Sequence, residues 1–234
     1  MSGSVHKPMV AKNYYRMLLH TLVKIVAMKD PYTAGHQYRV ADLAYRMAEM
    51  MALSSREREG LRWAALVHDV GKINVPAEIL SKPGRLSPFE VQLIQFHVET
   101  GYNILKDIPF PWPLAQIVLE HHERMDGSGY PVGLHGSQIS MSAKILAVAD
   151  TVESMASHRP YRPAMGIEKA LEEIEVNRWI LYEPAAVDAC LRLFRQQRYR
   201  FHEVNWHSLT AGLCPAGNGC YEHNQELKSF HGSL

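Results

Sequence analysis

Apolar residues recur along most of the chain at a spacing of three or four, with short polar breaks between the apolar segments. Residues at this spacing share one face of a helix, whereas strands would show strict alternation of apolar and polar residues. Because strand signals are scarce, the pattern predicts an all-α protein. Helices are expected over residues 12–28, 35–53, 54–71, 113–122, 140–157, 166–174 and 183–200, with a further helix opening at residue 87.

Local signals support several of these boundaries. Ser54 followed by Glu57, and Ser87 followed by Glu90, both fit the capping box that begins a helix. Gly71 is expected to end the third helix. Residues 126–136, rich in glycine, are expected to form a loop. We therefore expect an N-terminal extension over residues 1–11, one helical domain over 12–200 and an irregular tail over 201–234, where periodicity fades.

Composition narrows the class of protein. The 234 residues are 47% hydrophobic and carry a net charge of +1, so no broad electrostatic field favours DNA or an anionic membrane as partner. The apolar stretch over residues 17–28 is too short to span a bilayer and is interrupted by His20 and Lys24. Three cysteines, Cys190, Cys214 and Cys220, are too few for a disulfide framework. We expect a soluble cytoplasmic protein without membrane insertion.

The placement of the histidines changes this picture. On five predicted helices the apolar stripe continues at helical spacing onto, or borders, a histidine or aspartate, so those polar groups should point inward. A single buried histidine is usually a hydrogen-bonded core residue, but inward carboxylates beside several imidazoles need a compensating charge. The sequence therefore predicts a metal centre with seven ligands: His36, His68, Asp69, His97, His121, His122 and Asp150.

The types of ligand limit which metals and which reactions the centre can support. Imidazole and carboxylate groups suit Zn, Fe, Mn or Ni, and no thiolate joins the set. Asp69 directly follows His68 near a helix end, so its side chain could bridge two ions. Two ions roughly 3.5–4 Å apart can clamp a phosphodiester for in-line displacement. A zinc-protease motif beginning at His122 fails because Asp126 stands where the second histidine belongs, and a P-loop ending at Lys72 fails because Leu66 replaces its first glycine.

The motifs that carry these groups resemble those of the HD-GYP family, a branch of the HD metal-dependent phosphohydrolases. The similarity covers roughly residues 12–200. The matching segments are Asp30-Pro31-Tyr32-Thr33-Ala34-Gly35-His36, His68-Asp69-Val70-Gly71-Lys72, His97, His121-His122-Glu123-Arg124, Asp126-Gly127-Ser128-Gly129-Tyr130-Pro131, Asp150 and Arg159-Pro160-Tyr161-Arg162.

The resemblance implies an HD-domain helical bundle with extra helices. It also implies hydrolysis of cyclic di-GMP to linear pGpG or to GMP through a metal-bound hydroxide, with two divalent ions such as Fe or Mn. One ion would have four ligands: His36, His68, Asp69 and Asp150. The other would share Asp69 as a bridge and add three histidines: His97, His121 and His122.

Further roles follow from the same resemblance. Asp69 and Lys72 would be the catalytic residues, with Lys72 stabilising charge on the phosphoryl oxygens. Lys72 would also bind substrate, and Arg159 and Arg162 would hold its phosphate or guanine. Residues 127–131 would shape the rim of the site or contact a cyclase domain of the GGDEF type.

The chain departs from the family pattern at two points, and each changes what the resemblance implies about activity or regulation. Some members have a glutamate four residues before the first histidine and bind a third metal, whereas this chain has Tyr32 there. We therefore predict two metals, which makes GMP doubtful as the main product. No sensory or receiver domain precedes Lys12, so the chain is either a stand-alone enzyme or a fragment, with a separate sensor protein as regulator. The first helix would relay that signal, form a homodimer contact or pack in the core.

Alternatives remain open at this point. A cyclic dinucleotide receptor with little activity would use the same ligand site, and a phosphodiesterase for cyclic GMP-AMP would share the chemistry. In the tail, Cys214, Cys220 and His223, with His202 or His207, form an irregular candidate zinc site, although their spacing does not match the usual structural patterns. Cys190 is expected in the core.

Overall fold

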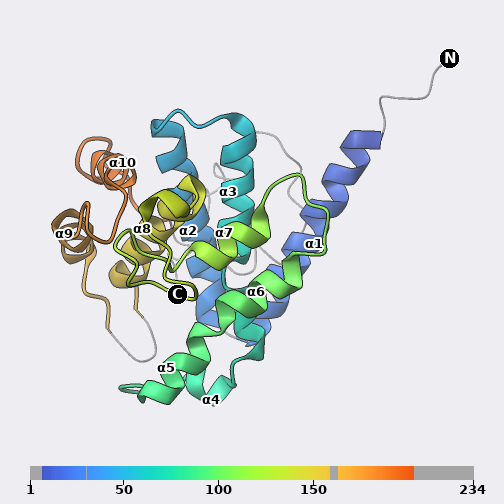
Figure 1. Ribbon diagram of the computed structural model, residues 1–234, viewed down its shortest axis with the longest axis horizontal. Coiled ribbons are helices and arrows are strands. Elements are labelled where there is room, and N and C mark those ends of the chain that lie inside the picture. The colour runs from blue at the N-terminus through green and yellow to red at the C-terminus, as the bar shows by residue number, and fades with distance from the viewer. Residues whose placement is uncertain (1–6, 30, 159–162, 203–234) are drawn as a thin grey trace, which may run out of the picture. The chain divides into compact units, whose positions relative to one another are not determined.

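The computed structural model describes residues 7–29, 31–158 and 163–202; for residues 7–13 and 31–34 it describes the backbone only. Within these ranges the chain is helical and contains no β-strand, which confirms the predicted all-α class (Figure 1). The α-helices are α1 (Lys7–Lys29), α2 (Pro31–Met50), α3 (Ser55–Val67), α4 (Ala77–Leu80), α5 (Pro88–Gln95), α6 (His97–Leu105), α7 (Leu114–Glu120), α8 (Met141–Ala156), α9 (Ile167–Val176) and α10 (Pro184–Arg195). Two 3-10 helices, η1 (Val70–Asn74) and η2 (Gly136–Gln138), complete the described elements.

The core lies where α2, α3, α7 and α8 pack against one another, with α1 covering α2 and α3, and α10 packed on α2 and α8 (Figure 1). Leu43, Met47, Leu61 and Leu146 are fully buried there. These apolar residues lie on the inward faces of α2, α3 and α8, as the helical periodicity of the sequence predicted. Cys190 is also buried in this core, as expected.

The capping signals mark the starts of α3 and α5. The hydroxyl of Ser54 accepts from the backbone N–H of Glu57, and the Glu57 carboxylate accepts from the backbone N–H of Ser54. Ser87 and Glu90 form the same reciprocal pair at α5. Both predicted capping boxes are therefore present.

The prediction that Gly71 ends the third helix is wrong. Helix α3 ends at Val67, and Gly71 lies inside η1. A Cβ atom at Gly71 would come within 1.9 Å of the carbonyl oxygen of His97 and 2.6 Å of the backbone nitrogen of Gly101. The missing side chain allows η1 to contact the backbone of α6.

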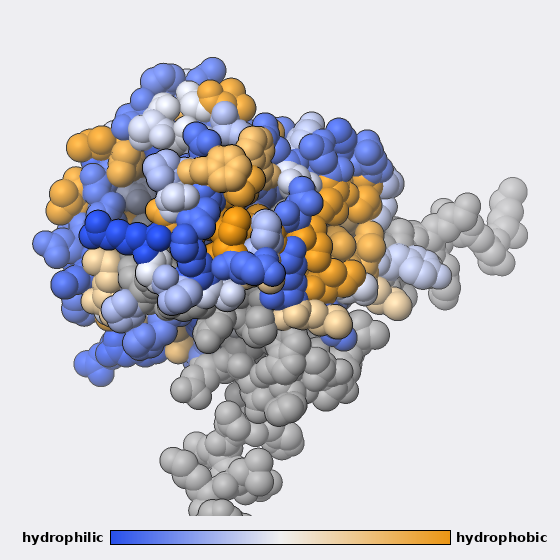
Figure 2. Space-filling model, turned by 90° about the horizontal axis from the view of Figure 1, so that it is seen from below, coloured by the Kyte–Doolittle hydropathy of each residue, from blue (hydrophilic) through white to orange (hydrophobic). Residues whose placement is uncertain are grey.

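The short helices α4 and α5 contribute no buried residue. Phe89 and Phe96 are exposed at and just after α5, as are Ile25 and Met28 on α1. On the face seen from below, apolar surface alternates with hydrophilic surface (Figure 2). We infer that α4 and α5 serve mainly to lead the chain from η1 to α6, which begins at His97. Among the described residues, none of the helices combines the length and apolar character needed to cross a bilayer.

Candidate metal centre

Segments far apart in the sequence bring the predicted ligands together. They come from α2, the end of α3, the start of α6, the end of α7 and the middle of α8. Five of the seven side chains are almost fully buried, namely His36, His68, Asp69, His97 and His121. His122 and Asp150 are partly buried, and the Asp150 side chain retains 13% of its exposure. The structure thus places all seven predicted residues in one buried cluster.

One group of ligand atoms surrounds His36. Its Nε2 lies 3.2 Å from Nε2 of His68 and 3.2 Å from Oδ1 of Asp150. Oδ2 of Asp69 lies 3.7 Å from Nε2 of His36 and 3.4 Å from Nε2 of His68. Ligand atoms of His36, His68 and Asp69 lie within 4.8 Å of one another, a spacing that can hold a metal ion.

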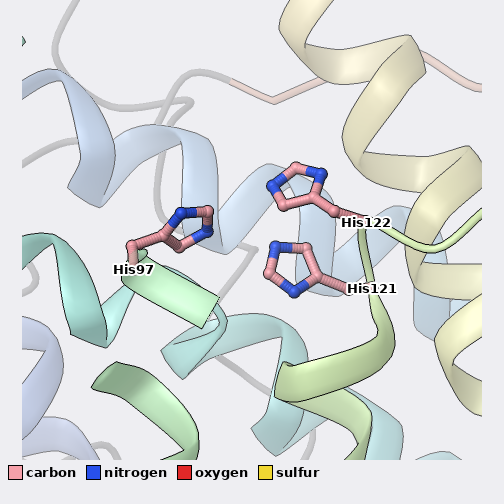
Figure 3. Close-up of side chains that lie close together, drawn as sticks. All are labelled: His97, His121 and His122. Atoms are coloured by element: carbon pink, nitrogen blue, oxygen red, sulfur yellow. The ribbon is translucent and has the colours of Figure 1, made fainter. Parts of the chain in front are cut away.

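The second group consists of His97, His121 and His122, whose rings face a common space (Figure 3). The ring centroid of His97 lies 5.4 Å from that of His121 and 5.1 Å from that of His122. The two groups meet at Asp69. Its Oδ1 lies 3.6 Å from Nε2 of His97, whereas its Oδ2 faces the first group. This is the placement expected of a carboxylate that bridges two ions.

Three of the imidazoles are oriented by backbone carbonyls that lie three residues earlier in the chain. Nδ1 of His68, His97 and His121 each bonds the backbone carbonyl three residues earlier, at 2.6–2.7 Å. In the neutral ring Nδ1 then carries the proton and donates it, which leaves Nε2 as the electron-pair donor. Nε2 of His97 and of His121 is buried, and the described residues offer it no hydrogen-bond partner. Because such orphaned atoms are costly, these residues fit a bound metal ion.

Burial sets the charge of the cluster. It lowers the pKa of His97 to about 4, and it holds the pKa values of His121 and His122 well below the ordinary value. Burial opposes the ionisation of Asp69, but Lys72 and the neighbouring imidazoles outweigh it and hold the pKa of Asp69 well below its usual range. Neutral imidazoles and an ionised carboxylate are the forms that bind metals.

Lys72 lies at the edge of this cluster. Its Nζ donates to Oδ2 of Asp69 at 2.8 Å, and its side chain is 16% exposed. Lys72 follows Gly71 on η1, and its ammonium group lies beside the Asp69 carboxylate. Arg159 and Arg162, predicted to bind substrate, lie outside the described residues, and so does the side chain of Tyr32. The tail positions Cys214, Cys220, His207 and His223 also lie outside them, whereas His202 is exposed.

The loop over residues 126–136 contacts the second histidine group directly. The Tyr130 ring stacks on His122 with centroids 4.7 Å apart, and the backbone N–H of Tyr130 donates to the His122 carbonyl. A Cβ atom at Gly129 would lie 2.4–2.5 Å from the backbone of residues 122–124. Only glycine therefore allows this close approach, which sets the Tyr130 ring against a proposed ligand.

Glu123 fixes the far side of the same loop. This side chain is 2% exposed, and its carboxylate accepts from the backbone N–H groups of Val132, Gly133 and Leu134. The sequence motif contained Glu123 but gave it no role. A buried glutamate next to a histidine pair was the available signal, but the acceptor role depends on the conformation of the loop.

We expect Glu123→Gln to loosen this loop, because hydrogen bonds to a charged acceptor are stronger than those to a neutral amide. The expected loss of stability is about 2 kcal/mol. Amide hydrogen exchange should accelerate at Val132, Gly133 and Leu134. Glu99→Gln, at an exposed position of α6, is the control and should change neither quantity. Unchanged exchange at the three amides would contradict the assigned role.

Comparisons with known proteins place the chain in a family. Residues 20–185 match the family model described as HD domain. A 3'3'-cGAMP-specific phosphodiesterase of Vibrio cholerae is 41% identical over 184 residues, which cover 77% of this chain and 40% of the relative. A protein of Thermotoga maritima named cyclic di-GMP phosphodiesterase is 40% identical over 188 residues, covering 78% of this chain and 51% of the relative. The chain thus spans about half or less of these relatives.

Solved structures support the fold. An HDG"Y"P protein from Bdellovibrio bacteriovorus aligns with a TM-score of 0.59 at 17% identity, covering 78% of this chain and 63% of that one. A cyclic GMP-AMP-specific phosphodiesterase of V. cholerae aligns with a TM-score of 0.58 at 18% identity, covering 77% and 49%. The predicted HD-type helical fold is confirmed. The chain belongs to the HD domain family, and the HD-GYP resemblance of its motifs is confirmed with it.

Proposed function

We propose that this chain is a metal-dependent phosphodiesterase that hydrolyses a cyclic dinucleotide, with cyclic di-GMP as the leading substrate and linear pGpG as the main product. The observation that carries the proposal is the position of Asp69. Its two oxygens face two separate groups of buried imidazoles, an arrangement suited to a pair of divalent ions. The names of the relatives from T. maritima and V. cholerae support the substrate class.

The proposed ligands follow the two groups. Asp69 would bridge the ions, His36, His68 and Asp150 would complete one site, and the three remaining histidines would complete the other. Bound divalent ions, with Fe or Mn as the leading candidates, would supply Lewis-acid polarisation of the phosphodiester. Burial lowers the pKa values of four of the imidazoles, those of His68, His97, His121 and His122, which favours the neutral form that binds metal. We also propose that Arg159 and Arg162 hold the phosphate or guanine of the substrate.

The ammonium of Lys72 is proposed to neutralise charge that develops on the phosphoryl oxygens, because it lies beside the bridging carboxylate. We expect Lys72→Met to lower kcat/KM about a hundredfold, as the loss of one such donor does elsewhere. The number of metal ions bound should not change. Lys82→Met is the matched control, since Lys82 pairs with Glu90 on α5 and its loss should leave activity intact. Full activity in the Lys72 variant would contradict the assignment.

The experiment that tests the proposed function measures metal content and cleavage together. Protein purified without oxygen is assayed for metals and then incubated with cyclic di-GMP or with 3'3'-cGAMP, and the products are separated by chromatography. Metal-dependent cleavage of cyclic di-GMP supports the proposal. Much faster cleavage of 3'3'-cGAMP would replace the substrate, a result that the relative from V. cholerae makes a specific alternative. Tight binding without cleavage would overturn the enzymatic proposal in favour of a receptor.

Regulation is proposed to come from a separate sensor protein or from a cyclase domain of the GGDEF type that contacts residues 127–131, within the loop over residues 126–136. Val132 in this loop is 66% exposed, although Glu123 fixes its backbone. A rigid loop with an exposed apolar side chain suits such a contact.

A further inference from the structure

A buried carboxylate that the sequence analysis did not identify lies directly behind the proposed metal centre. Glu153 lies on α8, three residues after Asp150, and is 0% exposed. Its Oε2 bonds Nδ1 of His36. Its Oε1 accepts from Nε of Arg39 at 2.7 Å and from Oγ of Ser157 at 2.7 Å. A buried charge with this many donors is compensated, so Glu153 can remain ionised in the core.

This contact distinguishes His36 from the other oriented imidazoles. His68, His97 and His121 each direct Nδ1 to a neutral backbone carbonyl three residues earlier in the chain. His36 instead directs Nδ1 to an anionic side chain from a different helix. An anionic acceptor fixes the ring and increases the basicity of the opposite nitrogen more than a carbonyl does. The two groups of ligands are therefore supported in different ways.

Arg39 provides the compensating charge from α2. Its Nη2 lies 2.6 Å from Oε1 of Glu153, and its side chain is 22% exposed. To reach Glu153, the guanidinium folds back along α2 past Gly35. A Cβ atom at Gly35 would lie 2.9 Å from Nη1 of Arg39. The glycine before His36 thus gives Arg39 room to pair with Glu153.

We propose that Glu153 is a positioning residue that orients His36 and strengthens its binding of metal. The guanidinium of Arg39 compensates the charge of the Glu153 carboxylate. This proposal depends on the proposed function in one respect, since it requires metal ions to bind at this cluster. It makes the two ion sites unequal. The site that contains His36 depends on a contact between α2 and α8, whereas the site of His97, His121 and His122 does not.

The test titrates the metal-free protein with Mn²⁺ alone and follows free Mn²⁺ by its electron paramagnetic resonance signal. Glu153→Gln keeps the size of the side chain but removes its charge. We expect one of two Mn²⁺ sites to weaken roughly 10–100-fold, while the other keeps its affinity. Glu153→Asp retains the charge and should weaken the same site less. If the glutamine variant does not fold, the aspartate variant must still show a loss at one site only.

Glu120→Gln is the matched control. Glu120 is buried at 4% exposure and accepts from the backbone N–H of Ser140, but no described histidine contacts its carboxylate. It should lower thermal stability without changing Mn²⁺ affinity, which separates positioning from general damage to the core. Equal weakening of both sites by Glu153→Gln, or weakening of neither, would overturn the proposal. If the unmodified protein binds two Mn²⁺ but cleaves no cyclic dinucleotide, the loss at one site still stands while the proposed function fails.

Discussion

Replacing Asp69 with asparagine is expected to lower kcat/KM on the order of a thousandfold or more. The reason is that several kcal/mol of transition-state stabilisation would depend on the two metal ions that this residue is proposed to bridge. Each Asp69 oxygen faces a different group of imidazoles, so both proposed ion sites would lose a charged ligand at once. Asparagine has nearly the same size, and the packing around it should persist.

Three measurements check this expectation: the rate of cyclic dinucleotide cleavage, the metal content and the thermal unfolding of the metal-free protein. Metal content should fall with activity, whereas unfolding should change far less. Asp107→Asn is the control, since Asp107 is exposed after α6 and lies outside the cluster. An Asp69 variant that retains two ions and most of its activity would remove the basis for a bridging carboxylate.

The second large effect is expected from Gly71→Ala. The new Cβ atom would approach the His97 carbonyl oxygen to 1.9 Å and the Gly101 nitrogen to 2.6 Å. Both neighbours are backbone atoms of α6, so relief requires η1 and α6 to separate. Overpacking of this kind costs about 3 kcal/mol or more. For a chain of this length, that loss lowers Tm by roughly 6–12 °C.

Thermal unfolding of the metal-free protein gives the measurement. Gly136→Ala is the matched control, because the close contacts of a Cβ there are with the flexible end of the Met125 side chain, and the nearest backbone atom lies at an ordinary 3.7 Å. A small change is expected for the control. Since His97 begins α6, the Gly71 variant should also bind metal more weakly. A Tm within 2 °C of the unmodified protein would show that η1 and α6 can separate without cost.

Much of the fold could be predicted because its signals are local. Each capping box lies within four residues, and each apolar stripe lies within one helix. The break between α5 and α6 was not visible in the pattern. Phe96 keeps helical backbone angles, with φ −59° and ψ −11°, and the apolar periodicity continues through it. Helix α4 has no buried residue, so the sequence offered no stripe from which to infer it.

The cluster was predictable because its proposed ligands are inward residues on amphipathic helices. Supporting residues were harder to identify, because their partners are distant in sequence. Gly71 contacts the backbone of His97, and Glu153 bonds His36. The spacing of Glu153 three residues after Asp150 placed it on the same helix face, and this was the signal available for its role. The spacing alone does not show where α2 lies. It therefore could not distinguish a carboxylate that only packs in the core from one that contacts a proposed ligand.

The carbonyl contacts of His68, His97 and His121 have a mechanical consequence. Each Nδ1 contact restrains a ring relative to a backbone carbonyl three residues earlier, which for His97, at the start of α6, is the carbonyl of Ile94 in α5. A shift of α5 and α6 relative to α7 would therefore also change the distance between Nε2 of His97 and Nε2 of His121. The geometry available to a metal ion in this cluster thus depends on how these helices are placed relative to one another.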